Sequence, residues 1–244
     1  MEYVELRQKV VEANRRIVDA GLVLLTWGNA SAVDDDREVM AIKPSGVDYE
    51  KLTPEAIPIV RLSDGKVISG TYTPSSDCDT HLELYRRFPG IGGVVHTHSH
   101  YAVCFAQAQT PVPCLGTTHA DHFFGDVPVT RMLTPDEIST AYERNTGAVI
   151  VETFEGGNID PQQIPGVLVA QHGPFTWGAT VDKAVENSIV LEEVARSGLH
   201  TYQIAASVDS PATEHLRADR TLVEKHFSRK HGPNAYYGQA GEMS

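Results

Sequence analysis

Two histidines separated by one residue give the clearest chemical signal in the 244-residue sequence. His96-Thr97-His98 directly follows Val94-Val95, an apolar pair that predicts the end of a buried strand. Side chains at positions i and i+2 of a strand point to one face, so both imidazoles would present nitrogen atoms side by side. A divalent metal needs ligands in this arrangement. The motif alone leaves metal binding and an incidental surface pair equally open.

Two further segments offer ligands of the same kind. The apolar strand predicted over 166–171 ends in His172, and Ser75-Ser76-Asp77 offers a carboxylate at the start of a predicted helix. Three histidines and one carboxylate suit Zn²⁺ acting as a Lewis acid, with room for substrate oxygens. Taken singly, His172 is better explained as a strand-end histidine and Asp77 as a helix cap.

Three short turns predict an anion site. Small polar turns at element boundaries expose backbone N–H groups, and a helix N-terminus adds a favourable dipole. With Lys43 nearby, these turns could hold a phosphate, although each is also an ordinary turn. Neither G-x-x-x-x-G-K-[ST] nor G-x-G-x-x-G occurs, which disfavours nucleoside triphosphates and NAD. The turns are Gly28-Asn29, Ser45-Gly46 and Ser75-Ser76.

Two other segments carry candidate acid/base groups. Asp121 lies in an acid- and histidine-rich run over 117–125, where it is either a proton-transfer group or a carboxylate that caps a turn. His226, Arg229 and Tyr237 lie close to the C-terminus. Because chain ends usually fray, functional residues there would need a docking surface such as a neighbouring subunit.

The elements that would position these residues follow from hydrophobic periodicity and turn signals. Thr134-Pro135-Asp136-Glu137 is a capping box that starts a helix. The mixture of helices and strands without strict alternation predicts one α/β domain with a mostly antiparallel or mixed sheet. We expect helices over 3–20, 75–88, 101–107, 134–145 and 180–197 and another near the C-terminus, and strands over 39–42, 57–62, 66–68, 92–97, 148–154 and 166–171.

Composition limits the partners. The formal charge of -12 argues against a nucleic-acid partner, because phosphate backbones are bound by Lys and Arg. The three cysteines show no C-x-x-C spacing, which disfavours a disulfide framework or a Cys-type zinc site. No stretch reaches the roughly 18 consecutive apolar residues of a membrane span. We therefore expect a soluble, cytoplasmic protein with no membrane partner.

Taken together, the motifs resemble the class II aldolase/epimerase family, and within it the L-ribulose-5-phosphate 4-epimerases. The resemblance runs from about residue 5 to residue 239, and the motifs occur in the family's order. They are Thr26-Trp27-Gly28-Asn29, Lys43-Pro44-Ser45-Gly46-Val47, Pro74-Ser75-Ser76-Asp77, His96-Thr97-His98-Ser99, Thr117-Thr118-His119-Ala120-Asp121, Val151-Glu152-Thr153-Phe154, His172-Gly173-Pro174-Phe175 and Tyr236-Tyr237-Gly238-Gln239.

The resemblance implies a single three-layer domain over residues 1–239, followed by a tail over 240–244. It also implies a homotetramer with active sites between subunits, in which Tyr237, His226 and Arg229 act from the adjacent subunit. Asp121 and Tyr237 would be the acid/base groups, and the three turns and Lys43 would hold the substrate phosphate. One Zn²⁺ per subunit would be held by Asp77, His96, His98 and His172.

The implied reaction interconverts L-ribulose 5-phosphate and D-xylulose 5-phosphate by breaking and re-forming the C3–C4 bond, in the catabolism of a pentose such as L-arabinose. The nearest alternative is a sister aldolase of the fuculose- or rhamnulose-phosphate type. In the fuculose branch a Glu usually stands where this chain has Asp77. A His-x-His metal hydrolase would need a longer barrel, and a non-enzymatic assembly protein has no use for Asp121 and Tyr237. One departure is His122, where the epimerases usually carry Tyr.

Overall fold

Seven strands form the centre of the computed structural model, which describes residues 2–208, 216–231 and 235–236. Their order across the sheet is β4-β3-β2-β1-β5-β7-β6, and each neighbouring pair is antiparallel. The strands are β1 (Asn29–Val33), β2 (Val39–Ile42), β3 (Ile59–Arg61), β4 (Val67–Ser69), β5 (Gly93–His96), β6 (Gly166–Leu168) and β7 (Pro174–Gly178).

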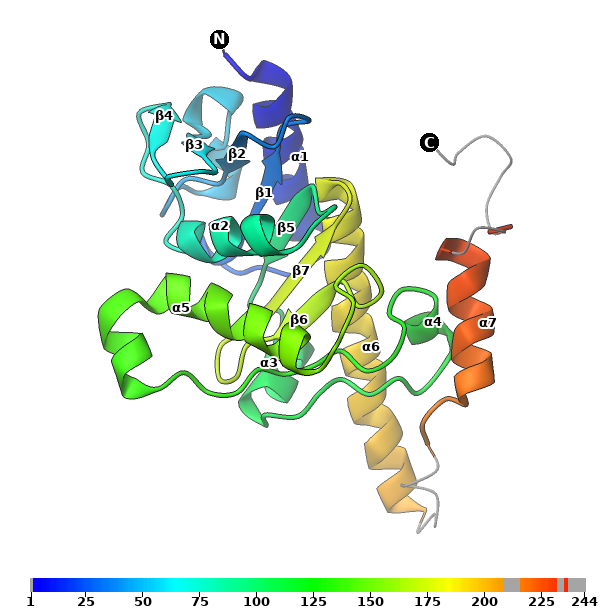
Figure 1. Cartoon of the computed structure of the whole chain (residues 1–244). Coiled ribbons are helices and arrows are strands. Elements are labelled where there is room, and N and C mark those ends of the chain that lie inside the picture. Colours follow the sequence, from blue (N-terminus) through cyan, green and yellow to red (C-terminus); the bar gives the residue numbers. More distant parts are fainter. Residues whose placement is uncertain (1, 209–215, 232–234, 237–244) are drawn as a thin grey trace.

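Helices cover this sheet, and two short 3₁₀ helices over 49–51 and 54–56 lead into β3. Figure 1 shows α2 and α5 side by side across the sheet, and α7 next to α4 at a distance from the strands. Within the described ranges, no helix combines the length and the apolar composition that crossing a membrane requires. The helices are α1 (Val4–Asp19), α2 (Cys78–Arg87), α3 (His100–Gln107), α4 (Thr117–Ala120), α5 (Pro135–Gly156), α6 (Val181–Ser207) and α7 (Arg220–His231).

The alternation of side chains along β2 shows how the layers form. Val39 and Ala41 pack into a core with α1 and the first turns of α6. Met40 and Ile42 point the other way, into a core with α2 and α5. Because successive strand residues face opposite sides, a strand that is apolar throughout must be covered on both faces. This confirms the predicted three-layer α/β domain.

Several predicted elements are confirmed, and one is wrong. The strand over 39–42, the hairpin of β3 and β4, and the capping box of Thr134 and Glu137 all form. Residues 148–154, however, continue α5 instead of forming a strand. The buried positions Gly147, Ile150, Val151 and Phe154 recur with a helical period, so the apolar run is one face of a helix packed on α2.

The start of α2 also differs from the prediction. Its first helical residue is Cys78, and Asp77 occupies the N-cap position without a side-chain capping bond. The Ser75 hydroxyl accepts hydrogen bonds from Asn29 Nδ2 at 3.0 Å and from the Asp77 N–H at 3.4 Å. Ser75 therefore bonds both to the first residue of β1 and to the backbone just before α2.

The two-sided core predicts a large cost for truncating Ile42. This side chain is fully buried, so Ile42→Ala should lower the free energy of unfolding by about 2–5 kcal/mol. Leu24, which is 67% exposed, is the matched control, and Leu24→Ala should change the free energy of unfolding by less than about 0.5 kcal/mol. Urea unfolding of both variants makes the comparison, and equal losses would contradict this description of the core.

Candidate active site

One pocket of about 560 Å³ collects most of the residues that the sequence marks as functional. It lies where β1 begins, β5 ends and α2 begins. Its lining contains every predicted metal ligand and every residue of the predicted anion site: Gly28, Asn29, Lys43, Ser45, Gly46, Ser75, Ser76, Asp77, His96, His98 and His172. Positions far apart in the sequence therefore form one concave surface.

Three histidines converge at one side of this pocket. His96 is the last residue of β5, His98 follows two residues later, and His172 lies in the turn between β6 and β7. Their possible ligand atoms all lie within 4.8 Å of one another. The ring centroids are 4.7 Å apart for His96 and His172 and 5.1 Å apart for His98 and His172. The predicted histidine set is thus brought together.

Hydrogen bonding prepares these imidazoles to accept a cation. His96 Nδ1 donates to the Pro174 carbonyl at 2.9 Å, so the lone pair of neutral His96 is on Nε2. That atom lies 3.1 Å from His98 Nε2. Burial lowers the pKa of His98, and burial together with His96 lowers the pKa of His172 to about 3. Imidazoles with convergent nitrogen atoms, one of them oriented by a backbone carbonyl, are a fitting ligand set for a divalent metal.

The turn that carries His172 depends on Gly173. A Cβ atom on Gly173 would lie 2.7 Å from the Thr97 carbonyl oxygen, a distance that real Cβ atoms do not adopt. The missing side chain lets this turn approach the segment between His96 and His98. Phe175, the next residue but one, stacks on the His96 ring with centroids 4.1 Å apart. Backbone approach therefore places the turn of His172, and stacking holds the His96 ring.

Asp77 lines the same pocket but is not one of the three converging residues. Its Oδ2 accepts a hydrogen bond of 2.7 Å from Asn29 Nδ2. Burial raises the pKa of Asp77, but His96, His81 and the bond from Asn29 outweigh burial and hold the pKa below its usual value. The carboxylate is therefore charged at neutral pH and available beside the histidines.

His81, one helical turn after Asp77, is a buried polar residue that sequence reasoning missed. Its Nδ1 lies 2.7 Å from Ser31 Oγ, which in turn lies 2.9 Å from the Tyr85 hydroxyl. Its Nε2 has no hydrogen-bond partner within the described structure. Burial lowers the pKa of His81 to about 3, so the ring is neutral. The signal in the sequence that could have pointed to His81 is its spacing of four residues from Asp77, which places both on one side of a helix.

The same pocket also carries a buried cation. Lys43 is 2% exposed, and its Nζ contacts the carbonyl oxygens of Thr26 and Pro44 and lies 4.7 Å from the centroid of the Tyr49 ring. Burial lowers the pKa of Lys43. These partners carry only partial negative charge, so an anion in the pocket would compensate the ammonium group. The turns at Ser45 and Ser75 lie beside it.

Three predicted residues form a second cluster outside this pocket. Arg229 Nε donates to Asp121 Oδ1 at 3.0 Å and Arg229 Nη2 to Asp121 Oδ2 at 2.6 Å. His226 Nδ1 lies 3.0 Å from Asp121 Oδ1. Burial raises the pKa of Asp121, but the hydrogen bonds from Arg229 and His226 outweigh burial and lower it. The cluster joins the end of α4 to α7, and none of the three lines the histidine pocket.

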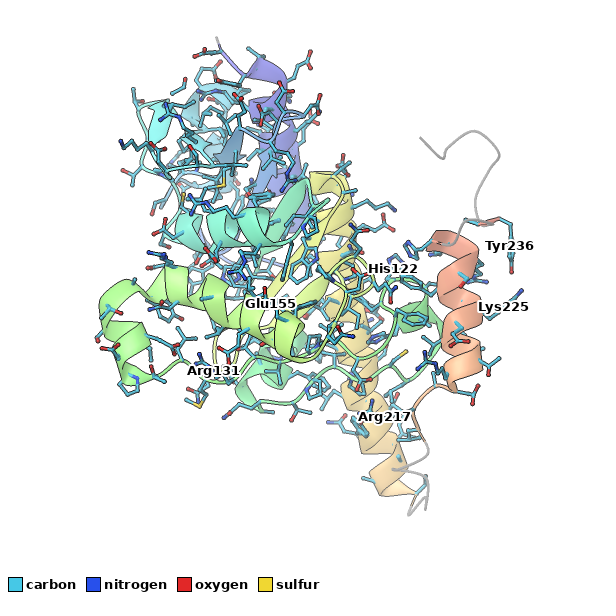
Figure 2. The ribbon with its side chains drawn as sticks, in the orientation of Figure 1. His122, Arg131, Glu155, Arg217, Lys225 and Tyr236 are labelled. Atoms are coloured by element: carbon cyan, nitrogen blue, oxygen red, sulfur yellow. The ribbon has the colours of Figure 1, made fainter. Side chains whose placement is uncertain are left out.

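Tyr236, which is among the described residues after α7, contacts this helix. The Tyr236 N–H donates to the Arg229 carbonyl at 3.0 Å, and Lys225 Nζ lies 5.3 Å from the centroid of the Tyr236 ring. Figure 2 shows Lys225 and Tyr236 on the side of α7 that faces away from the sheet, and His122 on the side towards it. His122 Nε2 lies 3.4 Å from Lys230 Nζ. The predicted acid/base residue Tyr237 lies outside the described residues, as does the predicted tail.

Two further residues line the histidine pocket without having been singled out by sequence. Tyr142 and Glu143 come from α5, within a helix that the capping box predicted. Nothing in their spacing distinguishes them from other helix residues. Their presence in the pocket depends on a kink in α5, which the sequence does not signal.

Comparison with known proteins identifies the family. The family model described as Class II Aldolase and Adducin N-terminal domain matches residues 8–199. The chain belongs to this family. An L-fuculose 1-phosphate aldolase has a similar structure, with a TM-score of 0.71 and 24% sequence identity over 92% of this chain and 97% of the other.

Two further solved structures also resemble this chain. YgbL from Klebsiella pneumoniae, for which aldolase, epimerase or decarboxylase activity has been suggested, has a TM-score of 0.69 at 24% identity over 91% of this chain and 97% of its own. The L-fuculose-1-phosphate aldolase from Thermus thermophilus has a TM-score of 0.65 at 23% identity, covering 83% of this chain and 96% of that one. At these identities the likeness shows the shared fold.

The Asp121 cluster predicts a pH-dependent contribution to stability. The pKa of the Asp121 carboxyl is lowered in the folded state. The stabilisation that its charged form provides is therefore present above the unfolded-state pKa of about 3.9 and is lost as the pH falls through the folded-state pKa. Asp121→Asn should lower the free energy of unfolding by about 2 kcal/mol at neutral pH. This difference from the unmodified protein should shrink below about pH 4. Urea unfolding across this pH range tests it; a pH-independent difference would contradict it.

Proposed function

We propose that the protein is a zinc-dependent L-ribulose-5-phosphate 4-epimerase of the class II aldolase family. The observation that carries the proposal is that one pocket joins a convergent histidine triad to a buried lysine and two serine-containing turns. A sugar phosphate has chemistry suited to both ends, because its phosphate is an anion and its carbonyl and hydroxyl oxygens are metal ligands.

The residues of this chain suit both ends of such a substrate. Lys43 and the turns at Gly28, Ser45 and Ser75 would bind the phosphate and serve as a pivot for the fragment that carries it. His96, His98 and His172, with Asp77 beside them, would hold the metal. When bound there, Zn²⁺ supplies Lewis-acid stabilisation of negative charge on substrate oxygens.

The proposed reaction needs two proton-transfer groups on opposite faces of the substrate. One of Asp121 and Tyr237 accepts the proton of the C4 hydroxyl as the C3–C4 bond breaks, and the bonding electron pair passes to the carbonyl side. The new aldehyde at C4 turns about the fixed phosphate and presents its other face. The bond then re-forms, and the other group returns a proton to the C4 oxygen. Retention of both fragments keeps the reverse step intramolecular.

The separation of the two clusters supports an active site shared between subunits. Asp121, His226 and Arg229 lie together on one chain but outside the pocket that holds the histidines. A heterologous contact between neighbouring subunits would bring this cluster of one chain to the pocket of the next. We therefore propose a homotetramer in which these residues and Tyr237 act on the substrate of the adjacent subunit.

A sugar-phosphate aldolase is the second candidate, favoured by the L-fuculose 1-phosphate aldolases among the similar structures. The same histidine pocket would serve bond cleavage with release of both fragments. Two residues favour the epimerase. Asp77 stands where the fuculose branch usually has Glu, and Asp121 matches an acid/base group that the resemblance to the epimerases implies.

Product analysis separates the two candidates. We expect the zinc-loaded protein to convert L-ribulose 5-phosphate into D-xylulose 5-phosphate without accumulating free aldehyde. His98→Ala removes a converging nitrogen and should lose zinc binding and turnover together. Chromatographic analysis of the products and zinc determination make the measurements. Accumulation of glycolaldehyde phosphate without the epimer would assign the protein to the aldolases.

Mixed oligomers test the shared site. His98→Ala subunits retain Asp121, and Asp121→Asn subunits retain the histidines, so each variant alone should be nearly inactive. Co-expressed with different affinity tags, they should form tetramers in which about a quarter of the sites combine a native pocket with a native neighbour. Activity of the doubly purified mixture supports the shared site, whereas an inactive mixture of intact tetramers would contradict it.

A further inference from the structure

The third histidine of the triad is held differently from the other two. His96 is fixed by the Pro174 carbonyl and by stacking on Phe175. His172 lies in a turn outside the strands and is half-buried. Its Nδ1 lies 3.3 Å from the Tyr142 hydroxyl, and the two rings are tilted by 33° at a centroid distance of 6.0 Å. Tyr142 therefore contacts Nδ1 of His172 and leaves Nε2, the other ring nitrogen, free to serve as the metal ligand.

A kink in α5 and the hydrogen bonds around it place Tyr142 beside His172. Helix α5 is kinked at Ala141, the residue before Tyr142, where φ is -150° and ψ is 65°. Asn145 Nδ2 donates to the Glu137 carbonyl across the kink at 2.8 Å, which satisfies a backbone acceptor on its far side. Thr146 Oγ1 donates to the carbonyl of Tyr142 itself at 2.8 Å. The side chains around the bend thus bond to backbone on both sides of it.

The helix that carries Asp77 also anchors this bend. Thr80 of α2 is fully buried, and its hydroxyl donates to the Glu143 carbonyl of α5 at 2.6 Å. Gly147 allows this approach, because a Cβ there would lie 2.6 Å from Glu83 Cβ. Tyr142 is therefore fixed relative to Asp77 through a direct contact between the two helices.

We propose that Tyr142 is a positioning residue for His172, whose hydroxyl oxygen accepts a hydrogen bond from His172 Nδ1–H and so directs Nε2 towards the metal. A hydrogen bond of this kind selects the tautomer and orientation of a ligand histidine. This inference rests on the proposed metal site and adds a residue that acts through His172.

Tyr142→Phe tests the assignment, because it removes the hydroxyl and keeps the ring. The apo variant should unfold thermally like the unmodified apo protein, whereas zinc affinity, measured by chelator competition, should fall about tenfold to a hundredfold. With Co²⁺ as a spectroscopic probe, the visible absorption bands should shift. Tyr202→Phe, which removes a half-buried hydroxyl on α6 away from the pocket, should change none of these quantities.

A double-mutant cycle identifies the residue through which Tyr142 acts. In a His172→Ala background, Tyr142→Phe should cause no further loss of zinc affinity, because the orienting partner is already absent. An equal loss in both backgrounds would overturn the proposal. The proposal would also be overturned if the unmodified protein binds zinc and Tyr142→Phe binds it equally tightly. That result would leave the proposed function intact. Failure of the unmodified protein to bind zinc would overturn both.

Discussion

The placement of β5 between β1 and β7 is the constraint on which the pocket depends. Its antiparallel register sets His96 opposite Asn29 on one side and opposite Phe175 on the other. The first pairing brings Asn29 within hydrogen-bonding reach of Asp77, and the second stacks Phe175 on the imidazole. A slip of one residue would turn His96 to the other face of the sheet and separate all these groups.

The two sides of the pocket have opposite electrostatic needs. Histidine nitrogens converge on one side, and on the other buried Lys43 lies against carbonyl dipoles and an aromatic ring, with Asp48 as a nearby negative charge. A cation satisfies the first side and an anion the second, although the whole chain carries a formal charge of -12. Local geometry therefore decides what the pocket can bind. A ligand with a phosphate at one end and ligating oxygens at the other would satisfy both sides together.

Much of this site could be predicted because its signals are local. The His96-Thr97-His98 spacing, the serine turns and the capping box at Thr134 each depend on neighbouring residues, and each predicted its structure or its place in the pocket. The helix beyond Asn145 was missed because a short apolar run fits a strand and a buried helix face equally well. The contact of Tyr142 with His172 joins residues 30 positions apart and requires a helix kink, so no local sequence pattern predicts it.

Within the proposed function, the ion pair of Asp121 and Arg229 has two effects that cannot be separated in one chain. It docks α7 beside α4, and it fixes the direction of the carboxylate that would meet a neighbour's substrate. The Tyr236 N–H also donates to the Arg229 carbonyl, so the same arginine binds the described backbone that follows α7. Under the proposed function, stability of the α7 contact and correct completion of the adjacent site would then depend on the same hydrogen bonds.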